Sequence, residues 1–168
     1  VDGSDLAAVE AALPGARLLY LESPTSWQIE ALNVQALAAL ARAQGVLSVI
    51  DNSWATPIFQ NPLELGVDLV VHSASKYIGG HSDLLLGTLS VNSEAAMQHV
   101  GKIYRLLGLA VSTDDCSLAL RGLQTLGVRL AQLEQTTLTV AKWLKGRPEI
   151  SLVLHPAFPD CPGNEIWK

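Results

Sequence analysis

The stretch DLVVHSASKYIGGHSD (residues 68–83) places a lysine behind an apolar run. Residues 69–71 are typical of a buried strand, and Lys76 follows where this apolar pattern stops. Gly79 and Gly80 come soon after, and glycine lets the backbone turn tightly and approach a ligand closely. The residues leave two interpretations of Lys76 open: a functional amine at the end of a strand, or a polar residue that caps the strand.

Ahead of this stretch, apolar runs alternate with helical patterns. The order strand, helix, strand, helix, strand favours parallel strands joined by right-handed crossovers, with helices on both faces of the sheet. The sequence therefore predicts an α/β domain. The predicted helices lie at residues 4–12 and 34–43, a short helical segment at 57–65, and the strands at 17–21, 46–50 and 68–72.

The part of the chain after Lys76 predicts one more strand and then helices. The next apolar run, 84–91, begins only about eight residues later, which is too few for a parallel crossover, so we expect an antiparallel strand. Helices are predicted at 93–107 and 114–145, and a further strand at 150–154. This pattern divides the chain into part of a large domain (1–112), a long connecting helix (113–146) and the start of a second domain (147–168).

Polar side chains follow each of the three parallel strands. They are Glu22 to Thr25, Asp51 to Ser53, and Ser73 to Lys76. Ligands of such sheets bind outside the carboxyl ends of the strands, so we expect these residues to share one edge. A lysine, a carboxylate and hydroxyls together suit pyridoxal phosphate, which needs a lysine to attach it, an acid at its ring nitrogen and donors for its phosphate.

Composition and charge argue against several other classes of protein. The net charge is −5 and lysines and arginines do not cluster, so neither nucleic acid nor an anionic membrane is an expected partner. No apolar run has transmembrane length and no secretory signal is visible, so the expected location is the cytoplasm. In that compartment Cys116 and Cys161 are expected to be unpaired thiols.

Other candidate residues are assigned structural roles. Arg121 and Arg129 are interpreted as solvated or interface charges in preference to site residues, and Trp54 and Tyr77 as packing around the site. The four histidines lack the spacing of metal ligands, so no metal is expected. A nucleotide-binding interpretation is weaker, because no GxGxxG follows the first strand. The histidines are His72, His81, His99 and His155.

Residues 68–82 resemble the lysine signature of the cysteine and methionine metabolism family of pyridoxal-phosphate enzymes. ESPT (22–25), DNSWATP (51–57) and SLALRGLQTLGVRL (117–130) resemble the same family in the same order. The resemblance implies the large domain of an aspartate-aminotransferase-type fold, with a mainly parallel sheet and one antiparallel strand. It implies that Lys76 is the Schiff-base lysine, Asp51 the partner of the pyridinium nitrogen, and Ser73 and Ser75 phosphate ligands. The family usually has threonine where this chain has Ser75.

Within the family, LQTLGVRL (123–130) and GNEIWK (163–168) resemble the bacterial cystathionine β-lyases most. This likeness implies β-elimination of L-cystathionine to homocysteine, pyruvate and ammonia, in a homotetramer. The γ-lyase, γ-synthase and methionine γ-lyase reactions stay open as alternatives on the same cofactor. Family members are more than twice as long and carry a glycine-rich phosphate loop, a stacking tyrosine and a carboxylate-binding arginine that have no counterpart here, so a truncated, non-catalytic fragment is the third alternative.

Overall fold

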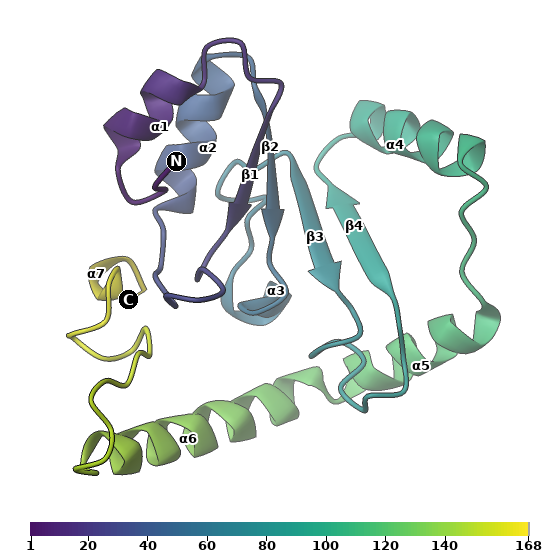
Figure 1. Ribbon diagram of the computed structural model, residues 1–168. Coiled ribbons are helices and arrows are strands. Elements are labelled where there is room, and N and C mark those ends of the chain that lie inside the picture. Colours follow the sequence, from purple (N-terminus) through teal and green to yellow (C-terminus); the bar gives the residue numbers. More distant parts are fainter. Residues whose placement is uncertain (168) are drawn as a thin grey trace.

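A four-stranded sheet in the order β1-β2-β3-β4 forms the centre of the computed structural model, which describes residues 1–167 (Figure 1). The first three strands are parallel, and β4 runs antiparallel to β3. The predicted α/β class and the predicted antiparallel strand are therefore both confirmed. The strands are β1 (Leu18–Glu22), β2 (Leu47–Asp51), β3 (Leu69–Ser73) and β4 (Gly87–Val91).

Seven helices are present in the described part of the chain, and several begin at a side-chain cap. Asp5, Asn33, Ser93 and Ser112 each accept a hydrogen bond from the backbone N–H three residues later, which satisfies one of the unpaired donors of the first turn. The helices are α1 (Leu6–Ala12), α2 (Val34–Ala43), α3 (Thr56–Phe59), α4 (Glu94–Leu106), α5 (Thr113–Gln124), α6 (Leu126–Lys145) and α7 (Asn164–Trp167).

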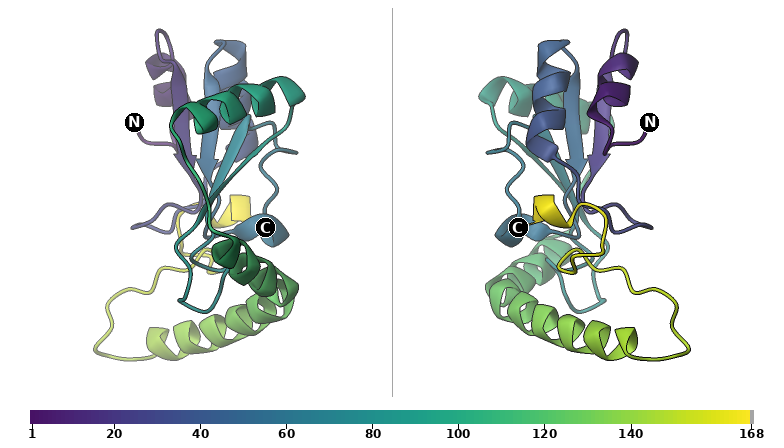
Figure 2. Two further views of the ribbon diagram at one scale, coloured as in Figure 1. Left: turned by 90° about the vertical axis from the view of Figure 1, so that its right-hand side faces the viewer. Right: turned by 90° about the vertical axis from the view of Figure 1, so that its left-hand side faces the viewer.

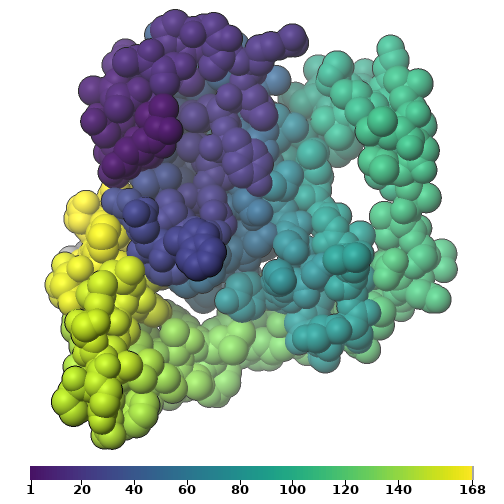
Figure 3. Space-filling view, viewed as in Figure 1, coloured from purple at the N-terminus to yellow at the C-terminus, as the bar shows by residue number. Residues whose placement is uncertain are grey.

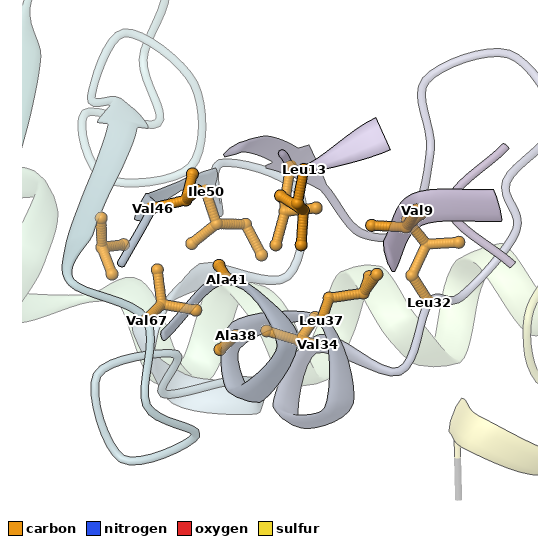
Figure 4. Close-up of a cluster of buried hydrophobic side chains, with 12 residues drawn as sticks. Val9, Leu13, Leu32, Val34, Leu37, Ala38, Ala41, Val46, Ile50 and Val67 are labelled. Carbon is orange, nitrogen blue, oxygen red and sulfur yellow. The ribbon is translucent and has the colours of Figure 1, made fainter. Parts of the chain in front are cut away.

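The main hydrophobic core lies between α1, α2 and one face of the sheet (Figure 4). Leu37 of α2, Ile50 of β2 and Val67 before β3 are all fully buried there. Burial alternates along β2 and β3, as expected for strands with one packed face. This core holds the parallel strands in register, and so fixes where their carboxyl ends lie.

The prediction that helices cover both faces of the sheet is wrong for residues 1–167. On the face away from α2, the side chain of Tyr20 is 59% exposed, Leu89 is exposed, and Val49 is only half-buried. The strand order gives the reason. β1, β2 and β3 follow one another in a single direction, and right-handed crossovers that advance in one direction all lie on the same face.

Two further predictions need correction in the second half of the chain. The expected single helix at 114–145 is two helices, because the chain breaks at Thr125 between α5 and α6. Residues 150–154 form no strand, since they lie beside neither edge of the sheet and a strand needs a partner. This segment instead leads back to the first half of the chain, where the thiol of Cys161 lies 3.7 Å from the carbonyl oxygen of Ile29.

The long helix α6 runs across the molecule beyond the carboxyl ends of β1, β2 and β3, as Figures 1 and 2 show. Helix α4 and the segment that follows it stand apart from β4, with an opening between them in Figure 3. Across residues 1–167, none of the helices combines the length and the apolar character needed to cross a bilayer.

Candidate active site

The ends of the three parallel strands bring two carboxylates side by side. Glu22 of β1 pairs in register with Asp51 of β2, and Asp51 with Val71 of β3. Because side chains alternate along a strand, Glu22 and Asp51 lie on the same face as Tyr20, the face that α2 does not cover. Burial, followed by the negative charges of Asp51 and Glu22, raises the pKa of the Tyr20 hydroxyl. The predicted alignment of the first two strand ends is confirmed.

Hydrogen bonds connect the end of β2 to the end of β3. The backbone N–H of Ser53 donates to Oδ1 of Asp51 at 2.9 Å, and the backbone N–H of Ser73 donates to Oγ of Ser53 at 2.6 Å. The Asp51 carboxylate is therefore oriented by the turn that follows it. Ser73 is held at its backbone, which leaves its side-chain hydroxyl without a hydrogen bond among the described residues.

Lys76 lies in a tight turn directly after β3. Its N–H donates to the carbonyl of Ser73 at 3.0 Å, and the N–H of Gly80 donates to the carbonyl of Lys76 at 2.7 Å. The side chain is exposed, and within residues 1–167 its Nζ makes neither a hydrogen bond nor an ion pair. No strand-capping contact of this amine is present among the described residues, and the functional role of Lys76 stays a prediction.

The residue before Lys76 ties the turn to β4. Oγ of Ser75 accepts a hydrogen bond from the N–H of Leu86 at 2.9 Å, and the N–H of Ser75 donates to the carbonyl of Leu86 at 3.2 Å. This hydroxyl therefore has a structural partner in addition to its predicted role at phosphate. That role stays a prediction, as do the roles of Lys76, Asp51 and Ser73.

A cleft of about 1020 Å³ opens over this turn. Lys76, Ser75 and Tyr77 line it on the strand side, and residues 128, 129, 132 and 133 of α6 line it on the other. Asp51 and Ser73 lie at the neighbouring strand ends and do not line the cleft itself. The structure thus brings Lys76 and Ser75 together on the cleft, and holds Asp51 and Ser73 beside it through the turn at Ser53.

One histidine lies buried just before this turn. His72 is 8% exposed, and its burial lowers the pKa of the imidazole, an effect that the charge of Asp51 partly offsets. Among the described residues, no three histidine, cysteine, aspartate or glutamate side chains are grouped as metal ligands require. The chemistry of this region is that of an amine, carboxylates and hydroxyls.

Sequence reasoning missed one residue of the site, Arg129. The sequence predicts a solvated or interface charge at this position, but Arg129 lines the cleft and its guanidinium donates to the carbonyl of Tyr77 at 2.8 Å. It also donates to the carbonyl of Gly122 and to the hydroxyl of Thr125. No local signal in the sequence marks Arg129, because its partners Tyr77 and Ile78 lie about fifty positions earlier in the chain. Arg121, in contrast, makes an exposed ion pair with Asp83.

The residues present fit pyridoxal phosphate. The amine of Lys76 is available on a cleft, the Asp51 carboxylate is held beside it by a backbone hydrogen bond, and the hydroxyl of Ser73 has no protein partner among the described residues. An amine to attach the cofactor, an acid for its ring nitrogen and a hydroxyl for its phosphate are the donors that this cofactor requires.

The chain matches the family described as "Cys/Met metabolism PLP-dependent enzyme" over residues 1–168. It is 40% identical to cystathionine beta-lyase of Bordetella avium over 92% of this chain and 39% of that protein. It is 40% identical to cystathionine gamma-synthase of Mycobacterium leprae over 97% of this chain and 42% of that protein.

Solved structures agree with this match. The crystal structure of cystathionine gamma-lyase from Lactobacillus plantarum complexed with L-serine matches 99% of this chain and 44% of that chain, with a TM-score of 0.94 and 39% identity. The chain thus spans about two fifths of the length of these proteins. Because the family match extends over every residue and the fold agrees, the chain belongs to the Cys/Met metabolism family of pyridoxal-phosphate-dependent enzymes.

Proposed function

We propose that the full natural chain containing residues 1–168 is a carbon–sulfur lyase that cleaves L-cystathionine by β-elimination. The observation that carries this proposal is the exposed amine of Lys76 on a cleft, one strand away from the Asp51 carboxylate. The products are homocysteine, pyruvate and ammonia. The homotetrameric assembly, the cytoplasmic location and the domain boundaries stay predictions.

The proposed roles follow from where each side chain lies. Pyridoxal phosphate, when bound, supplies a ring that accepts electrons and so stabilises negative charge at Cα of the substrate. Nζ of Lys76 attaches the cofactor and, once released by the substrate amine, takes the proton from Cα as general base. The Asp51 carboxylate holds a proton at the ring nitrogen. The hydroxyls of Ser73 and Ser75 orient the phosphate.

Turnover requires Lys76 in two capacities, as attachment point and as base. General acid–base catalysis alone contributes roughly 10²- to 10⁴-fold to a rate. Replacement of Lys76 by alanine is therefore expected to stop turnover rather than slow it. Replacement of Asp51 by asparagine removes the acid that holds the ring proton, and so lowers the rate while leaving attachment at Lys76 possible.

The first test locates the cofactor. The protein is incubated with pyridoxal phosphate, reduced with borohydride, digested and mapped by mass spectrometry. We expect label on Lys76, no label there in Lys76→Ala, and full label in the control Lys102→Ala, which removes an exposed lysine of α4. Label scattered over many lysines would contradict the proposed site.

The second test separates β-elimination from its alternatives. L-cystathionine is supplied to the full natural chain, and the 2-oxo acid released is identified. Pyruvate with homocysteine supports the β-lyase, whereas 2-oxobutanoate with cysteine means γ-elimination. The second outcome would keep Lys76 and Asp51 in their roles but reject the proposed substrate cleavage. The γ reaction is the alternative to exclude, because the cystathionine beta-lyase of Bordetella avium and the cystathionine gamma-synthase of Mycobacterium leprae are each 40% identical to this chain.

A further inference from the structure

The guanidinium of Arg129 hydrogen-bonds to the backbone that immediately follows Lys76. Nη1 donates to the carbonyl of Tyr77 at 2.8 Å, and Nη2 lies 3.5 Å from the carbonyl of Ile78. Hydrogen bonds from a charged donor are about twice as strong as neutral ones. Two successive peptide groups next to Lys76 are therefore held by one side chain of α6.

The same guanidinium is anchored to the break between the two long helices. Nε donates to Oγ1 of Thr125 at 3.0 Å, and Nη2 donates to the carbonyl of Gly122 at 2.8 Å. The Gly122 carbonyl also accepts from the N–H of Thr125 at 3.2 Å. The side chain of Arg129 therefore occupies a carbonyl in the last turn of α5. Insertion of a side chain into the hydrogen bonds of a helix is a recognised cause of a helix break.

A close backbone contact fixes the turn from the same side. A Cβ atom at Gly122 would overlap the carbonyl oxygens of Ile78 and Gly79, so α5 touches the turn directly at its glycine. Gly80 lies against the guanidinium of Arg129 in the same way. The turn is thus pressed between the end of β3 and the α5–α6 junction, and cannot shift without moving one of them.

We propose that Arg129 is a positioning residue that fixes the turn carrying Lys76, and that the break at Thr125 exists to aim its guanidinium at that turn. This inference rests on the proposed function of Lys76. Arg129 is not assigned to the substrate, because four of its five N–H groups are directed at protein acceptors, in Thr125, Tyr77, Gly122 and Ile78. A guanidinium used in this way has no free pair of N–H groups to offer a carboxylate.

The test compares Arg129→Met with the matched control Arg121→Met in the full natural chain. Arg121 lies on the neighbouring helix and makes one exposed ion pair, with Asp83. Three quantities are measured: amide hydrogen exchange of the peptide containing residues 76–80 without cofactor, the rate of reductive labelling of Lys76 by pyridoxal phosphate, and kcat with KM for cystathionine.

For Arg129→Met we expect the rate of amide hydrogen exchange at residues 76–80 to rise about tenfold, because the turn loses its hydrogen bonds from Arg129. Labelling of Lys76 slows, and kcat falls on the order of 10²-fold, since small displacements of a reacting group have effects of this size. KM changes little, because substrate contacts are intact. Arg121→Met leaves all three quantities at the level of the natural chain.

The proposal is overturned if Arg129→Met keeps the natural exchange rate, or if it raises KM with kcat unchanged, as a substrate ligand would. The exchange measurement needs no substrate, so it tests whether Arg129 fixes the turn even where the natural chain fails to cleave cystathionine. That failure would count against the proposed function alone.

A milder variant covers the case in which Arg129→Met does not fold. Thr125→Val removes the hydroxyl that receives Nε while keeping the size of the side chain. It should give smaller changes of the same sign in all three measurements, and Arg129→Lys should restore part of the loss by offering one cation to the same carbonyls. Natural exchange and natural kcat in Thr125→Val would reject the positioning role of Arg129.

Discussion

Replacement of Gly122 by alanine tests the packing of α5 against the Lys76 turn. The added methyl group would overlap two carbonyl oxygens, those of Ile78 and Gly79. Both belong to the backbone of a turn that Arg129 also holds, so they cannot move aside as a flexible side chain would. Overpacking of this kind costs about 1–3 kcal/mol, and the upper end applies here.

Alanine also favours a helix over glycine by about 1 kcal/mol, which offsets part of that cost. The expected net loss in the free energy of unfolding is therefore about 2 kcal/mol. Gly101→Ala is the matched control, because Gly101 lies within α4 and a Cβ there would have the end of the Arg105 side chain, at 3.5 Å, as its nearest neighbour outside the helix backbone. There, only the helix preference acts, and stability should rise by up to about 1 kcal/mol.

Urea unfolding followed by circular dichroism gives both values in the full natural chain. Reductive labelling of Lys76 adds a local measurement, which should slow in Gly122→Ala and stay unchanged in Gly101→Ala. Equal stabilisation of the chain by both substitutions would refute the reasoning, since it would mean that α5 does not touch the turn.

Three other outcomes follow from the structure. Asp68→Ala should lower the free energy of unfolding in urea by about 1–3 kcal/mol, because Oδ2 of Asp68 accepts hydrogen bonds from both the N–H and the hydroxyl of buried Ser48. An unchanged unfolding midpoint would contradict this. Burial lowers the pKa of His72 below its ordinary value of 6.5, so the unfolded chain binds the proton more readily and the free energy of unfolding should decrease as pH falls below about 6.5. His72→Gln should weaken that dependence between about pH 7.5 and 5.5, and an equal slope in both proteins would count against this reasoning. Cys116 is exposed, whereas Cys161 is buried and its thiol has a raised pKa. A thiol reagent should therefore label Cys116 in the native chain and Cys161 only after unfolding. Two fast-reacting thiols would show that residues 155–161 do not pack as described.

Local signals explain the elements that the sequence predicts well. The helix expected at 34–43 has the bounds of α2, because Asn33 caps its start and Gly45, at φ +67°, lies just past its end. The antiparallel β4 was expected from the short distance between Lys76 and the next apolar run. Both inferences depend on residues close together in the sequence, where propensity and loop length act directly.

The missed features depend on contacts between distant segments. Nothing near Thr125 predicts a break, since its cause is a guanidinium that reaches a turn about fifty residues earlier. The expected strand at 150–154 has the right residues but no neighbouring strand. The uncovered sheet face follows from strand order, which the alternation of strands and helices leaves open.

The site was predictable to the extent that strand ends align. Glu22 and Asp51, the last residues of β1 and β2, pair in register. The hydroxyl of Ser75, however, was assigned to phosphate alone, and its bond to Leu86 is visible only once β4 is placed. Arg129 was undervalued because an arginine on a helix is usually solvated.

The hydrogen bond from Arg129 to Tyr77 also bears on the order in which the chain assembles. It joins residues 52 positions apart, whereas the bond from Leu86 to Ser75 spans 11. Contacts between distant residues require the entropy of a long loop to be lost first, and so they form late. During synthesis the end of β3 is therefore built early, and the turn beside it stays loose until α6 has been made and has docked. The lysine is among the first parts of this region to be made and among the last to be set in place.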